Sequence, residues 1–376
     1  MTGAWSTACL AALGGAGDAL PFFPPPRRLA GQTVRQRVRL RRGGSAVRVV
    51  LSNEFGRVPL VIDAVTVGVG DSAAALPALC GGADGWEIEV GATATSDPVP
   101  LATSAGCELV VCCFVAAATE AGSCLLSAQQ TGEIAPGNQL GQSRLDDPEP
   151  FTALYWIARV LVDRHPGAGP VIVALGDSIT RGDGTTVDRD ERYPDHLQRR
   201  LLAAGLDDAV VLNAGIGGNR LLRGRVGPSM TDRFERDVLA GGEASHVLIL
   251  AGTNDIALSA MLGEERPTAA QIIDGLGGLA GRAARHGVRP VLGTITPFGG
   301  CSLEAFRTDG NEDVRRAVNE AITAQADWPV VDFATALAAP DDPARLAAAF
   351  DSGDGVHPGD AGAKALAGAV DLAMFR

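Results

Sequence analysis

The sequence predicts two domains, an all-β sandwich followed by a three-layer α/β domain with a doubly wound, five-stranded parallel sheet. Three observations indicate this. A length of 376 residues suits two domains better than one. Short strand-like runs separated by Gly, Pro, Asp and Ser fill the first part of the chain. In the second part, strand-like runs alternate with helical segments. We place the sandwich, of jelly-roll or carbohydrate-binding type, at 1–165 and the α/β domain at 166–376.

The composition limits the partners of this chain. A hydrophobic content of 46% with 20% charged residues is typical of a globular protein with a sizeable core. The net charge of −12 argues against nucleic acid, which needs a basic surface. No run approaches the roughly 20 apolar residues of a membrane span, and the N-terminus lacks the pattern of a secretory signal. We therefore expect a cytoplasmic protein of undefined oligomeric state.

The cysteines favour a reduced, metal-free protein. Seven are present, an odd count without metal-ligand spacing. Cys112 and Cys113 are adjacent in an apolar run, where buried thiols are expected.

The sandwich is predicted from its alternating patterns. Residues 1–25 are rich in Ala and Gly and then in Pro, and we expect them to wrap over a domain rather than enter its core. Val34–Arg41 places four arginines on one face and apolar residues on the other, which predicts a strand with a solvated face; a phosphate or glycan patch is the alternative. The remaining strands are expected at Val47–Ser52, Leu60–Val69, Trp86–Val90, Glu108–Val115, Cys124–Ser127 and Ala153–Val162.

The α/β domain begins with five consecutive apolar residues, Val171–Leu175, long enough for a strand buried on both faces. Further strands are predicted at Ala209–Leu212, His246–Ala251, Pro290–Gly293 and Val330–Phe333, and helices at Tyr193–Ala204, Ala269–His286, Glu312–Ala326 and Asp360–Met374. This alternation, with right-handed crossovers, predicts a flavodoxin-like sheet covered on both faces.

Ser178 follows the first of these strands directly, in Gly176-Asp177-Ser178. Ligands bind at the carboxyl ends of the strands in open α/β sheets, so a serine there faces substrate. The alternative is a serine that only caps the next helix.

Two other strand ends carry groups suited to a developing negative charge. The turn Asn213–Arg220 is rich in Gly but lacks the Gly that a dinucleotide fingerprint needs at Arg220. Such a turn also exposes a backbone N–H to an oxyanion. After the third strand, Asn254 offers an amide donor, although Asn254 or Asp255 could instead cap a helix.

Asp354 and His357 lie beyond the fifth strand. An acid and a histidine separated by two residues on a turn can hydrogen-bond directly, and the acid then fixes the imidazole tautomer, as a catalytic triad requires. The other four histidines lack such a setting.

Two polar clusters have alternative interpretations. Asp183, Asp188 and Asp190 could suggest calcium, but their spacing lacks the glycine and the terminal glutamate of an EF-hand loop, and we expect a solvated active-site loop. Arg220 and Arg223 could meet an anionic or sugar group, or could be ordinary surface arginines.

Together these clusters resemble the four sequence blocks of the SGNH (GDSL) hydrolases, over essentially all of 171–376. The matching blocks are Gly176–Ile179, the turn with Gly218 at the family's glycine position, Gly252–Asp255 with Asn254 at its asparagine position, and Asp354–Pro358. The resemblance implies a serine esterase with the triad Ser178, His357 and Asp354, an oxyanion hole of Ser178, Gly218 and Asn254, and neither cofactor nor metal.

A longer likeness concerns one branch of that family, arylesterases and acylhydrolases that carry an N-terminal β-sandwich. It lies in Arg192–Asp195, Gly217–Leu222, Arg233–Leu239 and Leu51–Gly56. Gly252-Thr253 and Gly355-Val356 depart from the branch pattern without removing a reacting group. For a serine esterase, we expect a short-chain O-acyl ester of a carbohydrate or aryl alcohol as substrate. A lysophospholipid or thioester substrate, a glycan-binding protein without activity, and a nucleotide or flavin binder are the alternatives.

Overall fold

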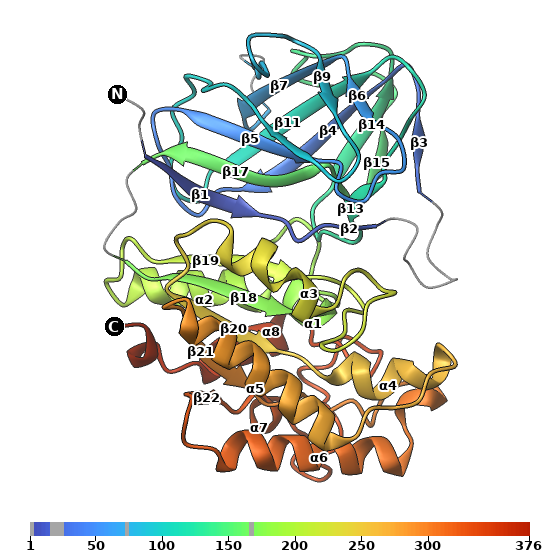
Figure 1. Cartoon of the computed structure of the whole chain (residues 1–376), viewed down its shortest axis with the longest axis vertical. Coiled ribbons are helices and arrows are strands. Elements are labelled where there is room, and N and C mark those ends of the chain that lie inside the picture. The colour runs from blue at the N-terminus through green and yellow to red at the C-terminus, as the bar shows by residue number, and fades with distance from the viewer. Residues whose placement is uncertain (1–3, 16–25, 72–74, 165–168) are drawn as a thin grey trace. The chain divides into compact units, whose positions relative to one another are not determined.

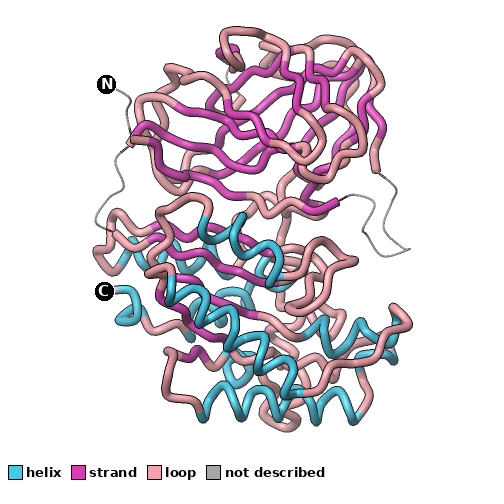
Figure 2. Tube along the Cα trace, viewed as in Figure 1, coloured by secondary structure: helices cyan, strands magenta, loops and turns pink. Residues whose placement is uncertain are grey.

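The chain forms two compact units, Met1–Gly167 and Ala168–Arg376 (Figure 1). The computed structural model describes residues 4–15, 26–71, 75–164 and 169–376. Figure 2 shows the contrast between the units, with strands in the first and alternating strands and helices in the second. The predicted fold class is confirmed, with antiparallel sheets in the first unit and a five-stranded parallel sheet in the second.

Antiparallel sheets build the first unit. The four-stranded sheet has the order β1 (Trp5–Leu10), β17 (Ile157–Asp163), β5 (Val47–Ser52), β10 (Thr93–Thr95). The six-stranded sheet has the order β15 (Glu149–Phe151), β14 (Gly132–Pro136), β4 (Gln32–Arg39), β11 (Glu108–Val115), β7 (Ala64–Val69), β8 (Leu76–Pro77). Shorter ladders join β12 (Thr119–Glu120) to β3 (Arg28–Leu29), β13 (Ser123–Leu125) to β16 (Leu154–Tyr155) and β2 (Gly14–Gly15), and β6 (Leu60–Ile62) to β9 (Trp86–Ile88).

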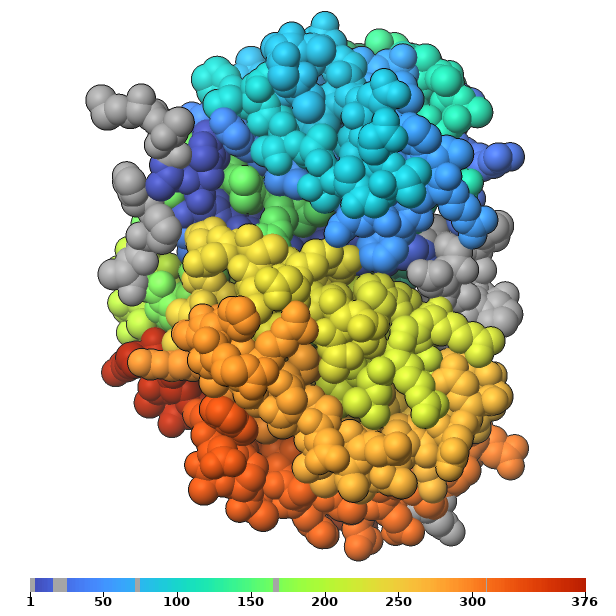
Figure 3. Space-filling view, viewed as in Figure 1, coloured from blue at the N-terminus to red at the C-terminus, as the bar shows by residue number. Residues whose placement is uncertain are grey.

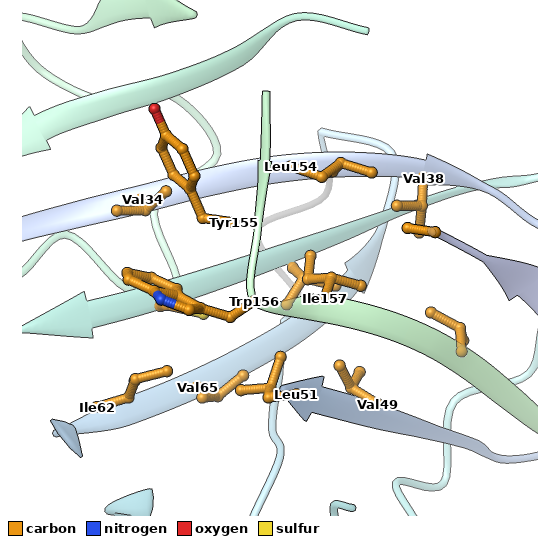
Figure 4. Packing of buried hydrophobic residues seen from close by; sticks show 14 of the residues in the cluster. Val34, Val38, Val49, Leu51, Ile62, Val65, Leu154, Tyr155, Trp156 and Ile157 are labelled. Atoms are coloured by element: carbon orange, nitrogen blue, oxygen red, sulfur yellow. The ribbon is translucent and has the colours of Figure 1, made fainter. Parts of the chain in front are cut away.

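Apolar side chains from both large sheets fill the core of this unit. Val34 of β4, Val49 of β5 and Val65 of β7 lie in one buried cluster with Trp156 (Figure 4). Because side chains alternate along a strand, each sheet contributes every second residue to this core.

The prediction for the N-terminus is wrong where the structure describes it. β1 pairs antiparallel with β17, and Ala8 and Leu13 belong to the buried core. Trp5–Leu10 lacks the two-residue period by which a strand is recognised, because Ser6, Thr7 and Ala8 are buried in succession. The proline-rich part of the prediction, residues 16–25, lies outside the described residues.

The arginine face of β4 is ion-paired rather than merely solvated. Register places Glu133 of β14 opposite Arg35, and Glu108 of β11 opposite Arg39. Arg35 is buried, with Nη1 3.7 Å from Glu133, and Arg39 lies 3.6 Å from Glu108. Opposite charges on directly facing strand positions stabilise a sheet modestly.

The second unit is a parallel sheet with the order β19 (Val210–Gly215), β18 (Val171–Gly176), β20 (His246–Leu250), β21 (Arg289–Gly293), β22 (Val330–Val331). Its helices are α1 (Ser178–Arg181), α2 (Tyr193–Ala203), α3 (Met230–Phe234), the π-helical turn η1 (Glu235–Leu239), α4 (Thr253–Met261), α5 (Ala269–Arg285), α6 (Asp309–Ala324), α7 (Phe333–Leu337) and α8 (Asp360–Ala369), with short 3₁₀ turns η2 (Glu304–Phe306) and η3 (Leu372–Phe375). The predicted C-terminal helix therefore ends earlier than expected, at Ala369.

Both faces of this sheet are covered. Ile172 and Ala174 of β18 pack in one cluster with Leu197 of α2 and Leu366 of α8. Figure 1 shows α8 behind the sheet and α5 in front of it. All six residues of β18 are buried, as the apolar run predicts. Among the described residues, no helix combines the length and apolar composition needed to cross a bilayer.

Candidate active site

Ser178 is the first residue of α1, directly beyond the carboxyl end of β18. The helix is capped by Asp177, whose Oδ1 accepts a hydrogen bond from the Ile179 backbone N–H at 3.0 Å. Capping is thus the task of the preceding residue, which leaves the Ser178 hydroxyl available for another partner. A side chain on Gly176 would collide with Thr180, so the tight turn from strand to helix requires glycine there.

The structure brings Ser178, His357 and Asp354 together. Ser178 Oγ lies 2.8 Å from His357 Nε2, and His357 Nδ1 lies 2.6 Å from Asp354 Oδ2. The other carboxylate oxygen of Asp354 accepts hydrogen bonds from the backbone N–H groups of Val356 at 2.9 Å and His357 at 2.8 Å. Both nitrogens of the imidazole are therefore engaged, in the arrangement that a base between a nucleophile and an orienting acid needs.

The turn that carries His357 is braced from within. Asp351 Oδ1 accepts hydrogen bonds from the backbone N–H groups of Gly353 at 2.9 Å and Gly355 at 3.0 Å. Gly355 has φ +75°, and a side chain there would collide with the backbone of Gly300. The hydrogen bonds to Asp351 and the close packing of Gly355 hold the four-residue turn from Asp354 to His357 in one conformation.

The charges around His357 favour its protonated form. Burial lowers the pKa of His357, but the hydrogen bond to Asp354 and the negative charges of Asp183, Asp354 and Asp177 raise it overall. Burial raises the pKa of Asp354, yet the hydrogen bond and charge of His357 and two backbone N–H donors lower it overall. Asp354 is thus held as a carboxylate that stabilises an imidazolium.

A glycine-rich turn at the end of β19 lies against α1. A side chain on Gly215 would collide with the backbone of Arg181, and one on Gly217 with the Arg181 guanidinium. Gly218 has φ +68°, and a Cβ there would lie 2.8 Å from Val226 Cγ1. Only glycine fits this left-handed, crowded position, which sets the direction of its backbone N–H.

Asn254 stands in the first turn of α4. Its Nδ2 donates to the Asn219 carbonyl oxygen at 3.1 Å and lies 3.3 Å from Asp177 Oδ2. Asp177 is buried, and burial raises its pKa to about 6. Asn254 thereby connects the strand-to-helix turn of β18 with the glycine-rich turn of β19.

Neither Asn254 nor Asp255 caps α4. The N-cap is Gly252, with φ +119°. The Asp255 carboxylate instead accepts hydrogen bonds from the backbone N–H groups of Leu221 at 2.7 Å and Leu222 at 3.0 Å. This carboxylate attaches the segment after Gly218 to the helix that carries Asn254.

Arg220 is not a surface arginine. It is 2% exposed, and Nη1 lies 2.5 Å from Glu264 Oε2. Arg223 keeps 44% of its side chain exposed and lies 3.4 Å from the same carboxylate. Figure 3 shows the segment after β19, coloured yellow-green, at the surface of the unit.

Two aspartates in the loop after Ser178 are ion-paired. Asp183 binds Arg181 at 2.6 Å, and Asp190 binds Arg192 at 2.7 Å. Within the described ranges, no group of three or more His, Cys, Asp or Glu side chains could hold a metal ion. All seven cysteines are described, and none is in a disulfide.

The sequence places Asp183 in the active-site loop after Ser178, but nothing in it marks Arg233 as a group near that serine. Asp183 contributes to the field at His357, and Arg233 donates to the carbonyl oxygen of Gly176, two residues before Ser178. Two of the four partners of Arg233 are backbone oxygens, which no residue type in the sequence marks.

Comparison with known proteins shows that the chain matches one family model. The family model described as "GDSL-like Lipase/Acylhydrolase family" matches residues 174–365, just over half of the chain. This span includes Ser178, Gly218, Asn254, Asp354 and His357. No curated protein matches the chain.

Several solved structures are similar at low identity. One, described as a lipolytic protein of the G-D-S-L family from Desulfitobacterium hafniense, is 21% identical and covers 53% of this chain and 96% of its own, with a TM-score of 0.41. An acetyl xylan esterase from Geobacillus stearothermophilus is 24% identical over 54% of this chain and 92% of its own, also at 0.41. A GDSL-like lipase from Bacteroides thetaiotaomicron is 19% identical over 54% and 87%, again at 0.41.

Proposed function

Because this chain belongs to the GDSL-like lipase/acylhydrolase family and is a carboxylic ester hydrolase, we propose that Ser178, His357 and Asp354 are its catalytic triad. The observation that carries the proposal is the chain of two short contacts, 2.8 Å from Ser178 Oγ to His357 Nε2 and 2.6 Å from His357 Nδ1 to Asp354 Oδ2. A serine hydroxyl is a weak nucleophile at its free pKa, and a base at this distance activates it.

In the first half of the reaction, Ser178 Oγ attacks the ester carbonyl carbon and its proton passes to His357 Nε2. The Asp354 carboxylate stabilises the imidazolium that forms. Collapse of the tetrahedral intermediate breaks the bond to the alcohol oxygen, which takes the proton from His357, and the acyl group remains on Ser178. Water then attacks the acyl-enzyme with His357 again as base, which releases the acid and restores the serine.

The oxyanion of each tetrahedral intermediate is proposed to bind three donors: the backbone N–H groups of Ser178 and Gly218 and the side-chain amide of Asn254. Their placement supports this role. Ser178 N–H is at the first position of α1, where a helix has no internal partner for it. The left-handed conformation of Gly218 sets the direction of its N–H. One Nδ2 hydrogen of Asn254 is held by the Asn219 carbonyl, and the oxyanion would take the other, which lies 3.3 Å from Asp177 Oδ2 in the structure. Each such donor contributes about 10²- to 10³-fold to kcat.

We propose a short-chain O-acyl ester of a carbohydrate or aryl alcohol as the substrate. The test compares hydrolysis of p-nitrophenyl acetate, butyrate and octanoate by wild type and by Ser178→Ala. Wild type should hydrolyse acetate fastest, and Ser178→Ala should fall to background on all three esters. Ser245→Ala is the matched control. Ser245 lies just before the amino end of β20, and its hydroxyl donates to the Val171 carbonyl oxygen at 3.1 Å. A rate unchanged by Ser178→Ala refutes the triad, and a preference for octanoate refutes the short acyl group.

A further inference from the structure

One buried arginine joins the segments that carry the proposed oxyanion donors. Arg233 of α3 is completely buried. Its Nη2 donates to the Gly176 carbonyl oxygen at 2.8 Å and its Nη1 to the Ala214 carbonyl oxygen at 2.8 Å. Its Nε donates to Asn219 Oδ1 at 2.9 Å. A single guanidinium thus spans the ends of β18 and β19 and the turn after β19.

Two of these partners lie close in sequence to a proposed oxyanion donor. Gly176 precedes Asp177 and Ser178 at the end of β18. Asn219 follows Gly218, and its own carbonyl oxygen accepts the hydrogen bond from Asn254 Nδ2 at 3.1 Å. A shift of the Arg233 guanidinium would therefore change the relative positions of all three donors.

The positive charge of Arg233 is paired with a buried carboxylate. Asp237 Oδ2 lies 2.7 Å from Arg233 Nη1, and Asp237 is itself buried, with Arg236 Nε 2.6 Å from its other oxygen. A buried guanidinium is costly unless it is paired and hydrogen-bonded; this one is paired with Asp237 and donates hydrogen bonds from all three of its nitrogens. Asp237 comes from η1, the π-helical turn in which Ala240 N–H donates to the Glu235 carbonyl at 2.8 Å. Such turns occur frequently at functional sites.

We propose that Arg233 is a positioning residue that fixes the geometry of the oxyanion hole; this rests on the proposed function of Ser178, Gly218 and Asn254. Arginine suits this task because its planar fork offers five donors in fixed directions, which a lysine ammonium cannot reproduce. The guanidinium donates no hydrogen bond to Ser178 or His357 in the described structure, so its effect should reach the oxyanion hole and leave the His357–Asp354 contact intact.

The test is Arg233→Lys, which keeps the charge beside Asp237 and loses the fork. On p-nitrophenyl acetate, kcat should fall at least tenfold, while KM stays within twofold of wild type and the pH midpoint of kcat is unchanged. Arg315→Lys is the matched control. Arg315 is buried, pairs with Glu312 at 2.6 Å and bonds the carbonyl oxygens of Ile295 and Pro343. It should lose a similar amount of Tm and keep kcat within twofold.

A folded Arg233→Lys protein with wild-type kcat overturns the inference, and so does an equal loss of kcat in Arg315→Lys. If Arg233→Lys does not fold, Asn219→Asp and Asn219→Ala decide. Both variants lose the Nδ2 donor to the Val226 and Pro228 carbonyl oxygens, and only the aspartate retains an acceptor for Arg233 Nε. The aspartate variant should keep several-fold more kcat than the alanine variant, and equal values overturn the inference. Ser178→Ala distinguishes failure of this inference from failure of the proposed triad. If Ser178→Ala keeps the activity of wild type, the triad itself is refuted.

Discussion

Thr186 and Asp360, which are 174 residues apart in the chain, are joined by two hydrogen bonds. The Thr186 backbone N–H donates to Asp360 Oδ1 and its hydroxyl donates to Asp360 Oδ2, each at 2.7 Å. Thr186 lies in the loop that follows Ser178, and Asp360 begins the helix that follows His357. The same two segments also pack closely at Gly184, where a Cβ would lie 2.8 Å from Ser352 Cβ. The two halves of the proposed triad are therefore held together outside the reacting groups.

This relationship predicts that Asp360→Ala lowers kcat about tenfold with little change in Tm, because a displacement of about 1 Å can cost up to about 10²-fold in rate. Asp360→Asn, which retains one acceptor and one donor, should recover most of the rate. Asp371→Ala is the control, since Asp371 caps η3 through Ala373 N–H at 2.9 Å and lies away from the triad. Steady-state kinetics on p-nitrophenyl acetate checks the prediction, and equal kcat values for Asp360→Ala and Asp371→Ala would contradict it.

The pH dependence follows from the surroundings of His357. His357 must be unprotonated to accept the serine proton, and burial, which lowers its pKa, is outweighed by the hydrogen bond to Asp354 and nearby negative charges. The kcat/KM of wild type should therefore rise with pH through a midpoint above about 6.5, the ordinary value for histidine. Asp183→Asn removes one of these charges and keeps the His357–Asp354 contact, so its midpoint should move to lower pH. A midpoint that stays or moves upward would refute this account of the field.

Asp354 is predicted to act through the orientation and charge of His357. Asp354→Asn should reduce kcat by about 10⁴-fold, as expected when the imidazole takes the wrong tautomer. Asp351→Asn tests the bracing of the same turn without touching the imidazole. It should cost stability in thermal unfolding and only a few-fold in kcat. Similar kcat losses in both variants would mean that Asp354 serves only the fold of the turn.

Asn254→Ala should lower kcat by about 10²- to 10³-fold with KM nearly unchanged, because an oxyanion donor acts in the transition state rather than in the ground state. Asn311→Ala offers a comparison, since it removes a buried amide that donates to the Ala305 carbonyl oxygen at 2.8 Å in the same unit. It should reduce Tm and leave kcat within about twofold. A loss confined to KM in Asn254→Ala would argue against an oxyanion role.

Gly218 should not tolerate a side chain. Gly218→Ala meets both a left-handed backbone, which costs a non-glycine residue about 1 to 3 kcal/mol, and a contact of 2.8 Å with Val226. Gly205→Ala carries the same backbone strain at φ +79° with no atom within 4 Å. Thermal unfolding should therefore show a smaller loss for Gly205→Ala, and only Gly218→Ala should also lose kcat. Equal losses of Tm would show that the contact with Val226 is relieved without cost.

The sequence predicts the second unit well because a strand buried on both faces is a continuous apolar run. Val171–Leu175 and His246–Ala251 are such runs, and the structure has strands there. Strands with small residues are harder to recognise. β1 was not predicted because its sequence does not alternate: Ser6, Thr7 and Ala8 are buried in succession.

The candidate site divides in the same way. Ser178, Gly218, Asn254, Asp354 and His357 are identifiable because their residue types fit the chemistry at strand ends. Arg233 and Asp360 were not identifiable, because their roles depend on contacts between segments distant in the sequence. Arg233 binds the carbonyl oxygen of Gly176, which is 57 residues away in the sequence. The hydrogen bonds from Thr186 to Asp360 join residues 174 apart and form only in the folded protein.

The most direct test of the triad is to find which residue becomes covalently modified. Wild type and His357→Ala would be treated with diisopropyl fluorophosphate and analysed by intact mass and peptide mapping. The triad predicts one adduct per wild-type chain, located on Ser178, and a labelling rate reduced at least a hundredfold in His357→Ala. An adduct on another residue, or unlabelled Ser178 in a preparation that hydrolyses p-nitrophenyl acetate, would contradict the assignment of Ser178 as the nucleophile.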